Sequence, residues 1–303
     1  MNNDNKVLCI DIGGTSIKIG IVSKNSIIES ASIRNSFKGN FEQLIPAIKE
    51  MCDKYISKYQ IKKMAVGCPG DIDDGKLIFA SNLGWHDIDV LSSFKENFKD
   101  VEIKIANDGY AASLAERKYG HLKDVDNAIF ITIGKGIGGS IICNGKEVKG
   151  ENNFASRIGH MVIKAGARRC NCGRKGCFEA YGSITGLIRT TKEYNLKWTK
   201  KDELIDVDKL SGYKILSYLN NGNKLVKEAI RRWNKDIVIG LLNLCHVFDP
   251  SVIVIAGGVT ESEFLDLDFI KEKLSKHKYD KCEIKLATLK GKTGLVGAGC
   301  LFD

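Results

Sequence analysis

The chain has 303 residues, of which 43% are hydrophobic and 27% charged, with 31 Gly and only 3 Pro. This composition is typical of a globular protein of about two domains and excludes collagen, a coiled coil and wholesale disorder. The net charge of +9 is spread along the chain, so we expect an anionic small molecule as ligand and no nucleic-acid partner. No apolar run is long enough to predict a membrane segment. The first residues lack the pattern of a signal peptide, so we expect a cytoplasmic protein.

The first part of the chain is predicted to alternate strands and helices. Gly13, Gly14 and Thr15 follow a β-rich run, and apolar residues alternate with polar ones directly after them. This period of two predicts that the glycines join two strands, whereas a dinucleotide-binding loop requires a helix at this point. The other expected elements are a helix over 41–59, strands over 63–66 and 101–106, and a helix over 110–119 that ends at Gly120.

The second part repeats the strand–glycine loop–strand arrangement. A strand over 128–133 precedes the glycine loop 134–139, and a strand over 140–143 follows it, ending in an Asn-Gly hairpin turn. Further on we expect a helix over 224–247, strands over 252–256 and 283–287, and a helix of small residues over 294–301. The repetition predicts two α/β halves built on a common plan, with one nucleotide cleft between them.

Three glycine motifs are candidates for phosphate binding. Without a Cβ atom, backbone N–H groups can approach a phosphate closely. The alternative for each motif is an ordinary tight turn, but two such hairpins and a third Gly-Gly pair after a strand favour phosphate. Asp11 ends the first strand, where a carboxylate can hold Mg²⁺ against phosphates or simply lie in a solvated turn. The glycines concerned are Gly13, Gly14, Gly134, Gly136, Gly138, Gly257 and Gly258.

Three polar residues each leave two interpretations open. Asn107 and Asp108 lie between a predicted strand and a predicted helix. They can cap that helix, or they can bind substrate at the carboxyl end of a strand, with Asp108 as a general base. Glu179 begins a further helix, where it is either a surface acid that stabilises the helix dipole or a ligand aimed into the cleft.

The most specific motif is a cluster of three cysteines near a histidine. Cys170, Cys172 and Cys177 with His160 supply three thiolates and one imidazole, which is a complete ligand set for tetrahedral zinc. Because all four coordination positions would be filled by the protein, we expect a structural zinc site. The alternative is three chance cysteines and a core histidine. Without a secretion signal, a disulfide scaffold is disfavoured.

Together these motifs resemble the ROK family, which comprises repressors, open reading frames and sugar kinases. The similarity runs in order from about Val7 to Leu301, and its zinc signature is highly specific. The motifs that carry it are Asp11-Ile-Gly-Gly-Thr15 with Lys18, Asn107-Asp108-Gly109, Gly134 to Gly139, Gly159-His160, Cys170-x-Cys172 to Glu179, and Ala256-Gly257-Gly258-Val259.

The resemblance implies the two-domain α/β hexokinase/actin-like ATPase fold, with a nucleotide and sugar cleft between the domains. It implies ATP, Mg²⁺ and structural Zn²⁺, phosphate transfer to a sugar hydroxyl (often the 6-OH), and usually a homodimer. In this frame Asp108 is the catalytic base. The implied sugar contacts are Asn107, Asp108, His160 and Glu179, and the implied ATP and Mg²⁺ contacts are Asp11, Thr15, Lys18, Lys135 and the glycines named above.

The expected domains are an N-terminal α/β domain over 1–118, completed by 288–303, and a larger α/β domain over 119–287 that carries the zinc loop. Residues 107–109 and 114–118 look somewhat like N-acetylmannosamine kinases, and glucokinases are equally compatible. The expected substrate is therefore a hexose or an N-acetylhexosamine.

Two positions depart from the family pattern. Arg157 stands where the family usually has a Glu that binds sugar hydroxyls, and Lys135 stands where it usually has Thr. These departures motivate an alternative, a non-catalytic protein that senses sugar or has a regulatory role. The repressor branch carries a helix-turn-helix before the kinase-like domain. The stretch before Asp11 is too short for such a motif, which argues against a DNA-binding repressor.

Overall fold

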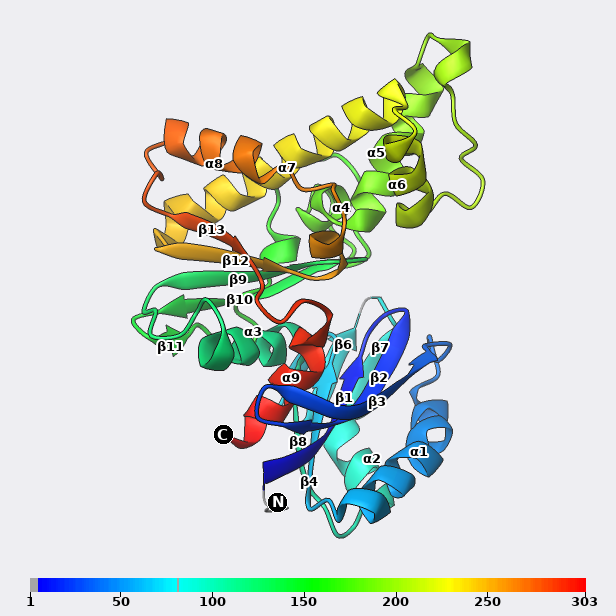
Figure 1. Cartoon of the computed structure of the whole chain (residues 1–303), viewed down its shortest axis with the longest axis vertical. Coiled ribbons are helices and arrows are strands. Elements are labelled where there is room, and N and C mark those ends of the chain that lie inside the picture. The colour runs from blue at the N-terminus through cyan, green and yellow to red at the C-terminus, as the bar shows by residue number, and fades with distance from the viewer. Residues whose placement is uncertain (1–4, 81) are drawn as a thin grey trace. The chain divides into compact units, whose positions relative to one another are not determined.

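The computed structural model describes residues 5–80 and 82–303. The chain divides into two compact units. Unit 1 comprises Met1–Val125, Val148–Ser156 and Ala287–Asp303, and unit 2 comprises Asp126–Glu147 and Arg157–Leu286. The chain therefore leaves unit 1 after Val125 and returns to it twice (Figure 1).

Unit 1 is built on a five-stranded sheet with the order β3-β2-β1-β4-β8. The first three strands are antiparallel, and β4 and β8 run parallel to β1. The strands are β1 Lys6–Ile12, β2 Ser16–Ser23, β3 Ser26–Arg34, β4 Lys63–Cys68 and β8 Glu102–Asn107. A smaller antiparallel sheet contains β5 Asp71–Asp73, β6 Lys76–Ala80 and β7 Trp85–Asp89.

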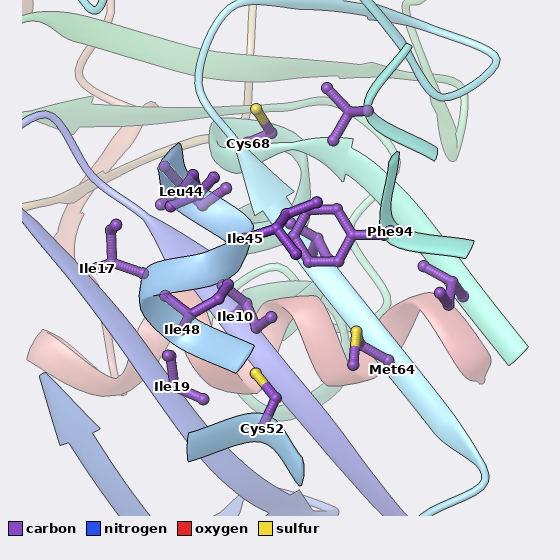
Figure 2. Close-up of a cluster of buried hydrophobic side chains, with 14 of the residues drawn as sticks. Ile10, Ile17, Ile19, Leu44, Ile45, Ile48, Cys52, Met64, Cys68 and Phe94 are labelled. Carbon is purple, nitrogen blue, oxygen red and sulfur yellow. The ribbon is translucent and has the colours of Figure 1, made fainter. Parts of the chain in front are cut away.

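The helices of unit 1 pack on both faces of its larger sheet. They are α1 Leu44–Tyr59, α2 Val90–Asn97, α3 Asp108–Tyr119 and α9 Thr293–Gly299, with 3-10 turns at Phe41–Gln43, Lys290–Lys292 and Cys300–Phe302. Leu8 and Ile10 of β1 are fully buried in a cluster with the apolar stripe of α1, whereas Val7 and Cys9 face the cluster that contains α9. Figure 2 shows Ile10, with other strand residues, among side chains of α1 and α2. Strand β1 is thus buried on both sides, as its continuous apolar sequence indicates.

Helices α3 and α9 approach each other through small residues. A Cβ atom added at Gly297 would clash with the carbonyl oxygen of Ala111, so only glycine permits this separation. Ala112 and Ala115 of α3 are also buried. This close approach holds the last helix of the chain against the helix that begins at Asp108.

Unit 2 repeats the sheet topology of unit 1. Its order is β11-β10-β9-β12-β13, again with three antiparallel strands followed by two that are parallel to the central one. The strands are β9 Ala128–Ile133, β10 Ile137–Cys143, β11 Lys146–Glu147, β12 Val252–Ala256 and β13 Glu283–Leu286. The common plan predicted from the two glycine hairpins is therefore confirmed.

The helices of unit 2 are organised around α7, a helix of 25 residues. They are α4 Glu179–Gly182, α5 Ile184–Lys197, α6 Gly212–Asn220, α7 Lys224–Phe248 and α8 Leu267–Lys276, with 3-10 turns at Ile158–His160, Lys201–Glu203 and Gly258–Glu261. Asn223 caps α7 by accepting a hydrogen bond from the Val226 N–H, and Asp249 ends it in a left-handed conformation. Among the described residues no helix combines the length and apolarity needed to cross a bilayer.

Several predicted boundaries shift by a few residues. The expected helix over 41–59 begins with a 3-10 turn, and its α-helical part starts at Leu44. Strand β10 starts at Ile137, three residues before the predicted strand, because the loop residues after Gly136 already pair with β9. Gly120 ends α3 in an extended conformation, not the left-handed one usual for glycine.

Candidate functional site

The first glycine turn of unit 1 is held by an asparagine. Gly13 donates its N–H to Ser16 at 2.9 Å, which closes the turn between β1 and β2. The Asn35 side chain donates to the Gly13 carbonyl at 2.7 Å, and the Asn35 N–H donates to the Thr15 carbonyl at 2.8 Å. Asn35 is itself buried, so the turn is fixed on both sides and leaves Thr15 exposed.

Asp11 lies beside this turn at the end of β1. It pairs across the strands with Lys18, whose ammonium donates to the Gly291 carbonyl at 3.1 Å. A Cβ atom added at Gly294 would clash with the Asp11 carboxylate. The absence of a side chain at Gly294 therefore lets the carboxylate pack against the first turn of α9. Burial raises the pKa of Asp11, and the charge of Lys18 partly offsets that effect.

Asn107 and Asp108 occupy the junction of β8 and α3. Asn107 caps the helix by accepting the Tyr110 N–H at 3.1 Å, and its amide donates to the Gly70 carbonyl at 2.8 Å. The capping interpretation is therefore confirmed for Asn107. Asp108 is the first residue of the helix, and one carboxylate oxygen accepts the Gly109 N–H at 2.8 Å.

The environment of Asp108 suits a proton acceptor. Burial raises its pKa to about 6, and the Asp11 carboxylate adds to the shift, although hydrogen bonding to Gly109 opposes it. Gly67 of β4 packs against the start of α3: a Cβ atom added at Gly67 would lie 3.7 Å from the Cα atom of Asp108. A carboxyl group with a pKa near the working pH is both ionised and basic enough to take up a proton.

In unit 2 the glycine loop between β9 and β10 is held by α4 and α5. The Gly134 N–H donates to the Gly136 carbonyl at 3.0 Å, and the Ile184 N–H donates to the Gly134 carbonyl at 2.9 Å. The Thr185 hydroxyl donates to the Lys135 carbonyl at 2.7 Å. The Lys135 side chain is exposed, which places a positive charge on the surface of the loop.

The Gly257-Gly258 pair ends strand β12. Gly257 adopts a φ of +93°, and a Cβ atom there would lie 2.5 Å from the Ile133 carbonyl oxygen, so both conformation and space require glycine. Gly258 is exposed, and no atom lies within 4 Å of its added Cβ position. A ligand can therefore approach the backbone of Gly258, next to the strand that leads into the other glycine loop.

The four predicted metal ligands come together in space. Their ligand atoms lie within 4.8 Å of one another. The sulfur atoms of Cys172 and Cys177 are 3.7 Å apart, and the Cys170 sulfur is 3.7 Å from Nδ1 of His160. Neighbouring sulfurs around tetrahedral zinc, with bonds of about 2.3 Å, are separated by about 3.8 Å. The cluster could therefore hold a metal ion, and its donor set fits zinc.

The loop that carries these cysteines is anchored to the helices of unit 2. Lys164 pairs with the buried Asp236 of α7 at 2.8 Å, and its ammonium lies 4.1 Å from the centre of the Tyr181 ring. The Arg168 guanidinium pairs with Glu193 at 2.6 Å, and the backbone N–H of Arg168 donates to the Tyr181 hydroxyl at 2.8 Å. The cysteine loop thus has contacts with α4, α5 and α7 in addition to its ligand atoms.

Glu179 is buried, with 8% of its surface exposed, so its interpretation as a surface acid is wrong. Its Oε2 atom accepts the Ile137 N–H at 2.9 Å, and its Oε1 atom is 3.7 Å from the Cys170 sulfur. The sequence signal was ambiguous because an acid in the first turn of a helix is equally common on a surface. Arg157 lies just before the 3-10 turn that contains His160, and its side chain is exposed.

Comparison with known proteins decides the family. The sequence profile of the ROK family matches residues 7–303. The chain belongs to the ROK family. The family resemblance predicted from the motifs is therefore confirmed over nearly the whole chain.

Individual ROK proteins are similar in sequence and structure. The glucokinase of Halalkalibacterium halodurans is 29% identical over 96% of this chain and 93% of its own length. The ROK glucokinase of Streptomyces griseus, solved with glucose and AMPPNP, has a TM-score of 0.87 and 26% identity, with 98% of each chain covered. The predicted hexokinase/actin-like ATPase fold is thereby confirmed.

ROK relatives also include regulators. The xylose repressor of Bacillus subtilis is 30% identical over 74% of this chain, which corresponds to 56% of the repressor. A Listeria monocytogenes structure described as a candidate N-acetylmannosamine kinase has a TM-score of 0.80 and 27% identity, with 98% of this chain and 99% of that chain covered. Family membership alone therefore leaves both the kinase and the sensing interpretation open.

Three residues of this ROK protein have structural roles that its sequence did not predict. Asn35 fixes the first glycine turn and Thr185 fixes the second, each from a distant segment. Glu116, a fully buried acid near the end of α3, accepts hydrogen bonds from the segment before α9. For Glu116 the sequence does contain a local signal, because it is a charged residue on the apolar side of a predicted helix.

Proposed function

We propose that this protein is an ATP-dependent sugar kinase that phosphorylates a hydroxyl, preferably the 6-OH, of a hexose or an N-acetylhexosamine. The observation that carries the proposal is Asp108, placed at the start of α3 with a pKa of about 6. The full-length similarity to a ROK glucokinase that binds glucose and an ATP analogue supports the same conclusion.

In this mechanism Asp108 accepts the proton of the attacking sugar hydroxyl as the sugar oxygen bonds to the terminal phosphorus of ATP, while the bond from that phosphorus to the bridging oxygen breaks and ADP leaves. Asn107, His160 and Glu179 are the proposed sugar contacts. Asn107 is oriented by its bond to Gly70, and Glu179 by its bond to Ile137. Because phosphoryl transfer depends mainly on positioning and charge neutralisation, residues held this firmly meet its main requirement.

The backbone of the two glycine hairpins is proposed to bind the phosphates of ATP, and the Gly257-Gly258 pair to bind ATP on its adenosine side. Lys18 and Lys135 add positive charge. Asp11 would hold Mg²⁺, which supplies charge neutralisation at the phosphates when bound. His160 and the three cysteines would hold a structural Zn²⁺. The homodimer and the absence of a nucleic-acid partner, implied by the family resemblance and by the chain's charge distribution, are part of the same proposal.

The test is a coupled assay of ADP release over a panel of hexoses and N-acetylhexosamines, with the Asp108→Asn variant as the control. Sugar-dependent ADP release by the parent, lost in the variant, supports the kinase. A protein that binds a sugar calorimetrically but releases no ADP with any of them would instead be a sensor. That second candidate is favoured by the exposed Arg157 at a position usually acidic in the family and by the repressor relatives.

A further inference from the structure

One carboxylate links the metal-ligand cluster to the second glycine loop. Glu179 follows the ligand Cys177 by two residues, and its two oxygens face different partners. Oε1 lies 3.7 Å from the sulfur of Cys170, whereas Oε2 accepts the N–H of Ile137, the first residue after the loop, at 2.9 Å. The position of Ile137 therefore depends on a side chain that adjoins the cluster.

The same segment holds the other end of the loop. Five and six residues after Glu179, the Ile184 N–H donates to the Gly134 carbonyl at 2.9 Å and the Thr185 hydroxyl donates to the Lys135 carbonyl at 2.7 Å. Together with the bond from Ile137, these contacts fix both ends of the glycine loop. All three come from one short stretch of chain that begins beside Cys177.

The histidine ligand reaches the loop by a second route. Gly159, the residue before His160, packs so tightly on the Ile137 carbonyl that a Cβ atom there would clash with it. Ile137 is thus held on its N–H side by the segment after Cys177 and on its carbonyl side by the turn that carries His160. A bound ion would fix these two segments relative to each other, because one carries the ligand His160 and the other directly follows the ligand Cys177.

We propose that metal occupancy of the His160–Cys170–Cys172–Cys177 cluster sets the conformation of the glycine loop 134–136 between β9 and β10, with Glu179 and Thr185 as positioning residues. Loss of the ion releases the two segments that hold Ile137, and the loop loses the fixed arrangement of N–H groups that a phosphate requires. The metal then controls phosphate affinity from outside the phosphate site. Only this last consequence rests on the proposed kinase function.

The direct test is amide hydrogen exchange of the full-length protein, metal-loaded and stripped with a chelator. Peptides covering 133–139 should exchange about tenfold faster after stripping, whereas those covering β12, in the same sheet, should be unchanged. Unchanged exchange in the loop would overturn the proposal. So would an equal increase in both segments, because the metal would then stabilise unit 2 as a whole.

A variant separates the loop contact from the metal itself. Thr185→Val removes the hydroxyl that holds Lys135 and keeps the side-chain shape. We expect faster exchange in 133–139, an unchanged metal content, and a several-fold larger dissociation constant for MgAMPPNP by calorimetry. Thr191→Val is the matched control, because the Thr191 hydroxyl, in the same helix, donates to the Leu187 carbonyl of α5 and not to the glycine loop.

The outcomes of the two arms are distinguishable. If Thr185→Val behaves like Thr191→Val in exchange, Thr185 does not position the loop and the proposal fails. If the loaded parent protein binds no MgAMPPNP, the proposed kinase function fails instead. The exchange measurement contains no nucleotide, so it still decides whether the metal controls the loop.

Discussion

The Asp11 carboxylate raises the pKa of Asp108, adding to the larger effect of burial, so that Asp108 titrates at about 6. Asp11 lies in β1, and Asp108 directly follows β8 as the first residue of α3; β4 lies between these two strands of the sheet. A general base must be ionised to accept a proton. We therefore expect kcat/KM for the sugar to rise with pH through about 6 and to level off above it. A pH–rate profile checks this, and an acid limb centred near pH 4 would contradict it.

Asp108→Asn removes the proton acceptor and keeps the size of the side chain. We expect turnover to fall by about two orders of magnitude or more, with the affinity for ATP nearly unchanged. Steady-state kinetics and calorimetry measure the two quantities. Near-parental turnover would show that Asp108 is not the base.

The same variant should also change the dependence of stability on pH. The pKa of Asp108 is about 6 in the folded protein, against an ordinary value of 3.8. The folded state therefore holds this proton more tightly, and its stabilising contribution is complete below pH 3.8 and lost as the pH rises through 6. Since Asn cannot ionise, Asp108→Asn should melt above the parent at about pH 8 but not at about pH 4.

Glu116 should be a major determinant of the stability of unit 1. Its carboxylate accepts hydrogen bonds from the Thr288 N–H at 2.7 Å, the Thr288 hydroxyl at 3.2 Å and the His121 N–H at 3.0 Å. Glu116→Ala leaves these donors without the acceptor, so the free energy of unfolding should fall by about 2–4 kcal/mol. Denaturant titration measures the loss. The exposed Glu50 of α1 supplies the control, because Glu50→Ala should change the free energy of unfolding by less than about 0.5 kcal/mol.

The cysteine cluster should bind about one zinc per chain, as elemental analysis would measure. Because structural zinc contributes free energy of folding, chelation should lower the melting temperature. The Cys172→Ser variant should lose the metal, whereas the control variant Cys143→Ser, at an exposed cysteine outside the cluster, should retain it. A metal-free preparation with unchanged melting would leave the cluster without a structural role.

Arg157→Glu should improve the proposed reaction. The family usually places a carboxylate here to accept hydrogen bonds from sugar hydroxyls, and a guanidinium has five donors and no acceptor. We expect at least a several-fold gain in kcat/KM on glucose or N-acetylmannosamine. If the variant instead loses activity on a sugar that the parent phosphorylates well, Arg157 determines specificity.

Features that depend on short stretches of chain could be predicted from the amino-acid sequence. Period-two alternation after Gly14 identifies a hairpin, which is confirmed by the pairing of β1 with β2. The candidate metal ligands were recognisable because three of them lie within eight residues, which confines them to one loop. The family motifs are equally local, and their order along the chain identified the fold.

Contacts between distant segments could be found only in the folded structure. Glu116 and Thr288 are 172 residues apart, and Asn35, which directly follows β3, reaches Gly13 in the turn between β1 and β2. Glu179 appeared in the sequence as an acid at a helix start with two interpretations, and only its burial against Ile137 and Cys170 excludes the surface one. Such contacts depend on strand register and helix packing, which combine information from the whole chain. The pKa of Asp108 has the same origin, because burial and the approach of Asp11 exist only after the sheet has formed.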